Sequence, residues 1–192
     1  HNKNKDLGFD KSQVLTTALQ GDMAKHLPLI KNQLIATGLV EQVGVSDVSI
    51  LNIYNNTSGF NWEGKDPNTS ILIGMLRADE GLVPALDLKM FDGRNFHANL
   101  LGDSTSVLIN ETLAKLIRKD GHVVGSILNY GEENYTIAGV VKNFVYNNVY
   151  ADPDPMLFIP LVRESGLLNI RTKAGIDLPQ AIQQIEKIIV KN

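Results

Sequence analysis

The stretch LLNIRTKAGIDLPQAIQQIEKIIV, residues 167–190, contains a strand and a helix in immediate succession. Residues 167–171 form a short, mostly apolar run, which predicts a strand. Asp177 predicts the N-cap of a helix, and Gln180 follows three residues later, as in a capping box. The apolar residues of this helix recur at helical spacing and form one stripe, which consists of Leu178, Ile182, Ile185 and Ile189.

The beginning of the chain has a similar plan, in the order strand, helix, strand. Residues 13–19 predict a strand. The helix is expected to begin at Pro28, because proline is tolerated at the first helical position, and to end before Gly38. The next strand is expected to include Val43, Val45 and residues 48–53.

The middle of the chain consists of short strands and turns. Residues 59–63 and 70–77 are predicted to pair as a hairpin across the polar turn between them. Residues 80–86 predict one or two helical turns. Residues 105–109 predict a strand that leads into a helix capped by Asn110. The apolar face of that helix is expected to contain Leu113, Leu116 and Ile117.

A second hairpin is predicted further along the chain, from residues 126–130 and 135–144. Since side chains alternate along a strand, Tyr135, Ile137 and Val141 are expected on one face. A last apolar strand is expected at residues 156–161, after a proline-rich break. Strand–helix units at both ends and a mostly β middle together predict an α+β fold.

Composition excludes several classes of protein. The 192 residues have a hydrophobic fraction of 43% and a net charge of −3, without a long basic block, so a folded domain that does not bind nucleic acid is expected. The absence of cysteine excludes disulfides and cysteine-ligated zinc. The longest apolar run, residues 156–162, is far shorter than the roughly 20 residues of a membrane helix. Because the chain begins without methionine, we expect it to be an excised fragment.

Known catalytic and cofactor motifs are absent from the sequence. There is no GxxxxGK[ST], GxGxxG, HExxH or GxSxG pattern. His26, His97 and His122 are isolated, with no second ligand at metal-binding spacing. We therefore predict no enzyme activity, no cofactor, and no catalytic, cofactor-binding or metal-binding residues. Positions that bind a partner are not assigned, although exposed loops are where recognition is expected.

Local features of the remaining acidic and aromatic residues favour structural roles. The pair Asp152 and Asp154 alternates with prolines and is interpreted as a turn. Glu132–Glu133 lies in the predicted hairpin turn, and Asp79–Glu80 is interpreted as the start of a helical turn. Phe60 and Trp62 suit either an exposed binding surface or, preferably, a strand packed on the core.

Four short sequence motifs follow one another in an order that is typical of one protein family. They are KDLGFDK at residues 5–11, LKMFDGRNF at 88–96, VLINET at 107–112 and YTIAGVVKNF at 135–144. Together they resemble the extracytoplasmic domain of ABC-transporter permeases of the FtsX and MacB type, especially those of Bacteroidetes. Residues 121–125, GHVVG, depart from the turn that many relatives carry at this place.

The resemblance implies a periplasmic domain of an inner-membrane permease. It implies a porter-like βαβ subdomain at residues 1–86 and 155–192 and an inserted β-rich Sabre-like subdomain at residues 87–154. An ATP-binding subunit or domain would hydrolyse ATP in the cytoplasm. The movement would then be transmitted to the periplasm, by mechanotransmission, for export or for control of a periplasmic partner protein. A homodimer is implied for the full-length permease, and the oligomeric state of the isolated domain is left open.

Two other functional classes remain as alternatives. An extracytoplasmic small-molecule sensor domain would require a closed apolar pocket with convergent polar groups. A secreted enzyme would require a cluster of acids or histidines with perturbed pKa values.

Overall fold

The computed structural model describes residues 13–51, 53, 56–98, 100–144, 153–161 and 165–192. The motif at residues 5–11 and Asp152 of the predicted turn therefore lie outside the described residues.

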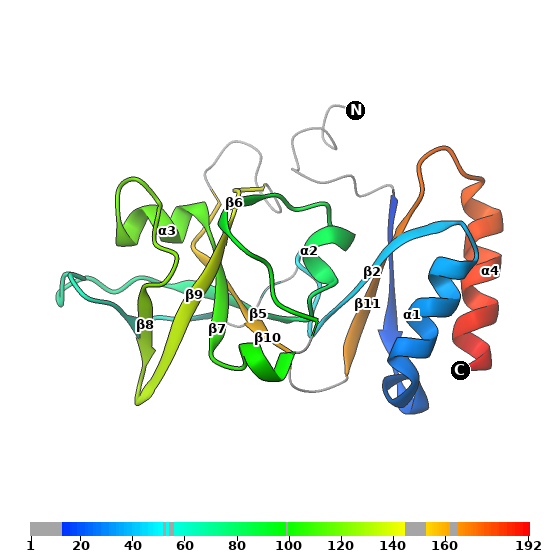
Figure 1. Cartoon of the computed structure of the whole chain (residues 1–192), viewed down its shortest axis with the longest axis horizontal. Coiled ribbons are helices and arrows are strands. Elements are labelled where there is room, and N and C mark those ends of the chain that lie inside the picture. The colour runs from blue at the N-terminus through cyan, green and yellow to red at the C-terminus, as the bar shows by residue number, and fades with distance from the viewer. Residues whose placement is uncertain (1–12, 52, 54–55, 99, 145–152, 162–164) are drawn as a thin grey trace.

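The described strands form one mixed sheet, flanked by short and long helices (Figure 1). The strands are β1 (Val14–Leu19), β2 (Val40–Ser46), β3 (Asn56–Thr57), β4 (Phe60–Asn61), β5 (Ile73–Ala78), β6 (Met90–Gly93), β7 (Ser106–Asn110), β8 (Ile127–Tyr130), β9 (Glu133–Val141), β10 (Met156–Pro160) and β11 (Gly166–Thr172). The helices are η3 (Gly21–His26), α1 (Leu27–Ala36), α2 (Leu82–Ala85), η4 (Leu100–Asp103), α3 (Glu111–Ile117) and α4 (Leu178–Lys191). The order in the sheet is β1-β11-β2-β5-β10-β7-β9-β8-β4, with β3 beside β5 and β6 beside β9. The predicted α+β class is confirmed.

The first and the last described elements, at residues 14–46 and 166–191, together form one end of the molecule. Strand β11, from the tail, lies between β1 and β2 and is antiparallel to both. Helices α1 and α4 lie together beside these strands, at the right of Figure 1. An apolar cluster beneath the helices draws only on residues 15–45 and 161–189. The predicted strand–helix units are confirmed, and the structure joins them into a split βαβ arrangement.

The helix starts in these units follow the predicted signals. Helix α1 begins at Leu27 with proline in its first turn, directly after η3, and Gly38 follows its end at a φ of 77°. The Asp177 carboxylate accepts a hydrogen bond from the Gln180 backbone N–H, 3.4 Å away, as an N-cap does. Local chemistry therefore determines where these helices begin.

The prediction that the second strand continues over residues 48–53 is wrong, because β2 ends at Ser46. The Ser46 hydroxyl donates to the Val48 carbonyl, 2.7 Å away, and the Asp47 N–H donates to the Arg77 carbonyl. The first bond bends the chain after Ser46, whereas the second still joins Asp47 to β5. Ile50 instead packs in the core from outside the sheet.

The predicted hairpin of residues 59–63 with 70–77 is also wrong. Strand β4 pairs with β8, whereas β5 pairs with β2, β3 and β10. The Phe60 ring lies 4.8 Å from the Tyr130 ring, centroid to centroid, and is buried. Burial of this aromatic side chain against β8 and β9 favours the distant partner over the neighbouring segment.

The hairpin of β8 and β9 is confirmed, but one of its faces differs from the prediction. The pairing of β7 with β9 shifts between Val107 and Leu108, so that Ala138 is an additional residue in β9. Ile137 therefore faces one apolar cluster and Val141 faces the other. A β-bulge reverses the alternation of side chains and explains why the two residues do not share a face.

The strand and helix after residue 105 follow the prediction, except at one position. The Asn110 side-chain oxygen accepts hydrogen bonds from the N–H groups of Leu113, at 3.0 Å, and Met156, at 3.1 Å. It thus caps α3 and also fixes the start of β10. Leu116, predicted on the apolar face, is 50% exposed, because Leu113, Ala114 and Ile117 occupy the side that faces the sheet.

The sheet is narrow between β2 and β5, and we call this connection the neck. One residue pair, Ser46 with Ala78, is described between the two strands, and the backbone hydrogen bonds of Asp47 with Arg77 and of Asp79 with Val45 flank it. Beside it, β2 and the turn before α2 touch through their backbones. A Cβ atom on Gly44 would lie 2.4 Å from the carbonyl carbon of Gly81, so side chains do not fit at this contact.

A buried carboxylate completes the neck. The Asp79 side chain is 7% exposed and accepts hydrogen bonds from the backbone N–H groups of Val45, at 2.8 Å, and Gly81, at 3.0 Å. Its other oxygen lies 2.6 Å from the Lys31 ammonium of α1. Asp79 therefore connects α1, β2 and the turn before α2.

Candidate functional site

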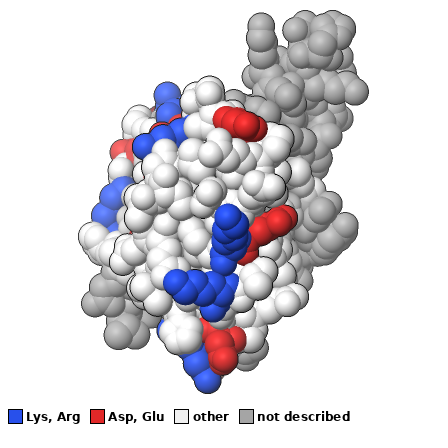
Figure 2. Space-filling view, turned by 90° about the vertical axis from the view of Figure 1, so that its right-hand side faces the viewer, with Lys and Arg blue, Asp and Glu red and all other residues white. Residues whose placement is uncertain are grey.

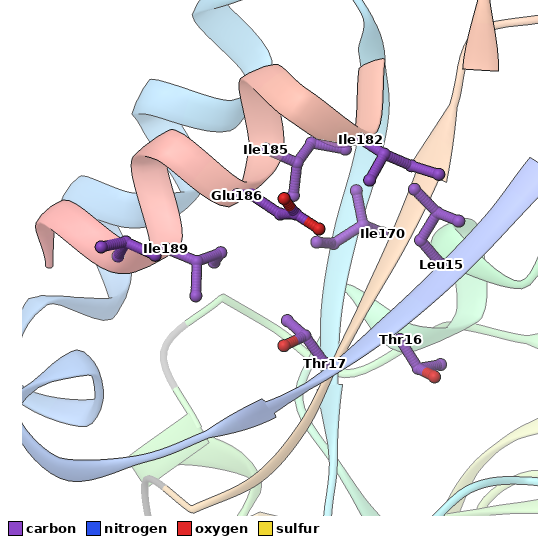
Figure 3. A pocket seen from close by; sticks show the side chains of 9 residues that line it. Leu15, Thr16, Thr17, Ile170, Ile182, Ile185, Glu186 and Ile189 are labelled. Atoms are coloured by element: carbon purple, nitrogen blue, oxygen red, sulfur yellow. The ribbon is translucent and has the colours of Figure 1, made fainter. Parts of the chain in front are cut away.

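An apolar groove of about 260 Å³ lies between strand β1 and helix α4 (Figure 3). Its wall on the helix side includes Ile182, Ile185 and Ile189 of the stripe predicted from the sequence. Leu15 and Thr17 of β1 lie on the opposite side. The core covers this stripe only in part: Ile185 is buried, whereas Ile182 and Ile189 are only half-buried.

Strand β1 is an edge of the sheet along its whole length. It pairs with β11 over six residues without a register shift, and no other described strand pairs with it. Its sequence, VLTTAL, contains no charge, proline or glycine. Natural sheet edges are usually protected by charges, prolines or bulges, so an edge without them is suited to accept a further strand.

The groove contains a single ionisable residue, Glu186. Figure 3 shows its carboxylate directed from α4 toward the groove. Charged side chains are scattered over the end of the molecule that carries α1 and α4, and much of that surface is uncharged (Figure 2). At the rim of the groove, Val190 is 85% exposed. The site is thus an open, apolar channel with one negative charge.

The groove does not match the pocket expected of a small-molecule sensor. Its lining polar groups are Thr16, Thr17 and Glu186, and it opens along the edge of β1. Small-molecule sites usually enclose about 300–1,000 Å³ and place several polar groups around the ligand. The alternative of a sensor domain receives no support from this geometry.

The three histidines considered from the sequence are placed apart from one another by the fold. His26 ends η3, His97 follows β6, and His122 follows α3. His122 Nδ1 lies 3.0 Å from an Asp92 carboxylate oxygen, and its ring stacks on Phe91 with centroids 5.1 Å apart. Among the described residues, no group of three or more His, Asp or Glu side chains is arranged to hold a metal ion.

The acidic residues considered from the sequence have structural contacts. The Asp154 backbone carbonyl accepts a hydrogen bond from the Asn110 amide at 2.8 Å, and Glu133 accepts one from the Tyr135 hydroxyl at 2.8 Å. Asp79 and Glu80 lie just before α2, as their interpretation as the start of a helical turn expects, and Asp79 is in addition the buried centre of the neck. Gly81, two residues after Asp79, is the sequence signal of the Asx-turn that it forms.

Phe60 and Trp62 belong to the core. Their exposed fractions are 1% and 8%, and they pack in the cluster that contains Leu128 and Ile137. The preferred interpretation of this segment, a strand packed on the core, is confirmed. The Lys65 ammonium lies 5.8 Å from the Trp62 ring, which is within the range of a cation–π contact.

A second buried carboxylate holds the loop after β6. Asp103 is buried and pairs with Arg94 through two hydrogen bonds, at 2.9 and 3.2 Å. It also accepts a bond from the His97 backbone N–H. Burial raises the pKa of Asp103, but the hydrogen bonds from Arg94 and His97 outweigh it and hold the pKa below its ordinary value.

This lowered pKa predicts an acid-sensitive contribution to stability. A carboxyl group whose pKa is lower in the folded state stabilises the protein above its unfolded pKa of about 4, and this stabilisation is lost as the pH falls through the folded value. We expect the stability lost by the wild type between pH 5 and pH 2 to be smaller in Asp103→Asn. Urea unfolding at a series of pH values measures the difference. Asp22→Asn, a surface control with a 75% exposed side chain, should follow the wild type. Parallel curves for wild type and Asp103→Asn would contradict the assignment.

The comparisons with known proteins agree on one family. The model of the MacB-like periplasmic core domain family matches residues 8–188. The structure is similar to the periplasmic region of MacB from Actinobacillus actinomycetemcomitans, with a TM-score of 0.61 at 14% identity, covering 97% of this chain and 86% of that chain. It is also similar to the extracellular domain of the noncanonical ABC-type transporter YknZ from Gram-positive bacteria, with a TM-score of 0.57 at 16% identity, covering 85% and 82% of the two chains.

At these identities the solved structures establish the fold alone, and no curated protein matches the chain. Within the described residues, no helix is long and apolar enough to cross a bilayer. The family match extends over almost the whole chain, and the predicted resemblance is confirmed. This chain therefore belongs to the family of MacB-like periplasmic core domains, which are extracytoplasmic domains of ABC-transporter permeases.

Proposed function

We propose that this domain is the periplasmic part of an inner-membrane permease and that it transmits movement produced by cytoplasmic ATP hydrolysis. The movement would serve export or the control of a periplasmic partner protein. The observation that carries the proposal is the family match over residues 8–188. ATP would be hydrolysed by a separate ATP-binding subunit or domain, since the chain has no phosphate-binding loop.

The neck supports a mechanical role. A domain that transmits movement must keep its two ends in a fixed relation, and one residue pair with two backbone hydrogen bonds would be a weak connection by itself. The contact of Gly44 with Gly81 and the three hydrogen bonds to Asp79 add backbone contact and buried polar bonds at this place. Such a junction favours movement of the domain as one body.

The division into subdomains is part of the proposal. Residues 1–86 and 155–192 would form the porter-like subdomain, and residues 87–154 the Sabre-like subdomain. The apolar cluster built only from residues 15–45 and 161–189 supports a unit formed by the two ends of the chain. We further propose that the domain has no catalytic activity and that two copies come together in the full-length permease.

Distance measurements on the full-length permease test this function. The 192 residues contain no cysteine, so in a permease whose cysteines outside this domain have been replaced, Lys119→Cys introduces one spin-label site per copy, at an exposed position after α3. We expect the distance between the labels of two copies to differ between the nucleotide-free state and an ATP-bound state trapped with a hydrolysis-deficient ATP-binding subunit. The isolated labelled domain, with ATP added, serves as the control. An unchanged distance between the two states would contradict mechanotransmission, and a missing dipolar signal would contradict the homodimer.

A further inference from the structure

We propose that the groove between β1 and α4 binds an extended segment of a partner protein, which adds to the sheet as a strand beside β1. The segment would place apolar side chains at alternate positions into the groove and a basic side chain against Glu186. The inference concerns binding by the isolated domain and does not depend on the proposed transmission of movement.

The backbone of β1 provides the first part of the site. Along one edge its six residues pair with β11, and along the other edge no described strand pairs with them. Every second residue of an edge strand directs its N–H and C=O groups away from the sheet. Six residues extend over about 20 Å, which is enough to align an added strand by backbone hydrogen bonds. This mode of recognition takes its affinity from the main chain and its specificity from alternate side chains.

The groove provides the second part. Leu15 and Thr17 lie on its strand side, and α4 covers it with Ile182 and Ile189. A strand added beside β1 would direct every second side chain toward the same face of the sheet, which is the face that α4 covers. Half-buried isoleucines beside the open edge would then be removed from water by those side chains. Because the groove is open and has a volume of about 260 Å³, it can accept a few side chains of a bound strand more readily than it can enclose a small molecule.

The negative charge of Glu186 indicates which kind of side chain the partner places in the groove. Glu186 is the only ionisable residue of the groove; it also lines a neighbouring hollow with Lys187 and Lys191, but no ion pair is formed by it with the described residues. A carboxylate beside an apolar channel favours a basic side chain at the matching position of the bound strand. A second copy of the chain would offer β1 itself, VLTTAL, which has no basic residue to place there. The charge therefore favours a different partner over self-association.

A designed peptide tests the site directly. The probe is a fluorescein-labelled nine-residue peptide that alternates threonine and valine and has lysine in place of one central valine. We expect fluorescence polarisation to show binding to the isolated domain, at least tenfold weaker for the same peptide with glutamate in place of lysine. N-methylation of its ladder-forming amides should abolish binding, because a strand cannot pair without these donors.

Charge exchange provides the matched control. Glu186→Lys is expected to reverse the preference, so that the glutamate peptide binds more tightly than the lysine peptide. Glu132→Lys makes the same change of charge in the turn between β8 and β9, outside the groove, and should leave the preference unchanged. Both positions are exposed, so both variants are expected to fold.

Several results would overturn the proposal. Equal binding of the N-methylated peptide would exclude strand addition, and an unchanged preference in Glu186→Lys would exclude the charge contact. A concentration-dependent dimer that Thr16→Lys removes would assign the groove to a second copy. Binding that begins only after residues 1–12 are removed would assign it to the chain's own N-terminal segment.

Discussion

Gly81→Ala is expected to destabilise the domain by about 3 kcal/mol or more, because this position has no room for a side chain. An added Cβ would lie 2.1 Å from the Val43 carbonyl oxygen and 3.0 Å from the Gly44 Cα. Both obstacles are backbone atoms of β2, so no flexible side chain can move aside. The φ of Gly81 is −82°, an ordinary value, which means that space and not backbone conformation requires glycine here.

Urea unfolding of the isolated domain measures this effect. Gly102→Ala is the control, since a Cβ at that position would meet no atom within 4 Å. Gly44→Ala should reproduce the loss, because its Cβ would lie 2.4 Å from the Gly81 carbonyl carbon. A Gly81→Ala protein within about 0.5 kcal/mol of the wild type, the usual range for a neutral surface change, would show that the neck is not packed this closely.

Asp79→Ala is expected to cost about 3 kcal/mol, the second large effect at the neck. The substitution removes the acceptor of the Val45 and Gly81 N–H groups, and buried donors without partners are costly. It also removes the oxygen that lies 2.6 Å from the Lys31 ammonium. Of the two ion pairs that Lys31 forms, only the one with Glu80, at 3.7 Å, would remain. Loss of all three bonds should loosen the connection of α1 with β2.

Hydrogen exchange and urea unfolding together distinguish this role from that of an ordinary surface acid. The Val45 and Gly81 amides should exchange faster in Asp79→Ala, because each loses its acceptor. Asp22→Ala is the matched control: its carboxylate pairs with Lys25, but both side chains are largely exposed, at 75% and 78%. Exchange at Val45 as slow as in the wild type would mean that Asp79 does not hold the strand.

Features that depend on a few neighbouring residues were predictable from the sequence. Asn110 and Asp177 cap their helices as predicted, because a cap needs only one side-chain oxygen and a backbone N–H two or three residues later. Proline in the first turn and the glycine after α1 act over similarly short distances. The β8–β9 hairpin, whose strands are joined by a short turn, also followed from the pattern.

Only one side of the candidate groove, the helix side, could be predicted from the sequence. The stripe of Ile182, Ile185 and Ile189 was predicted, but a stripe does not reveal whether a core covers it completely. Its position beside the outer edge of β1, where no described strand pairs, arises from the pairing of the other edge with β11, about 150 residues later in the chain. No local signal places Glu186 at the rim of a groove.

The sequence by itself thus determined the fold class, the helix starts, the main hairpin and the family. Only the tertiary structure decided which strands pair, where β2 ends and that Ala138 shifts the alternation of β9. It also decided that Asp79 is buried at the neck, which its position before a helical turn does not reveal. The physical reason is the range of the interactions: caps and turns are satisfied within a few residues. Which strands pair depends on how well side chains such as Phe60 are buried, and the residues that bury them come from distant parts of the chain.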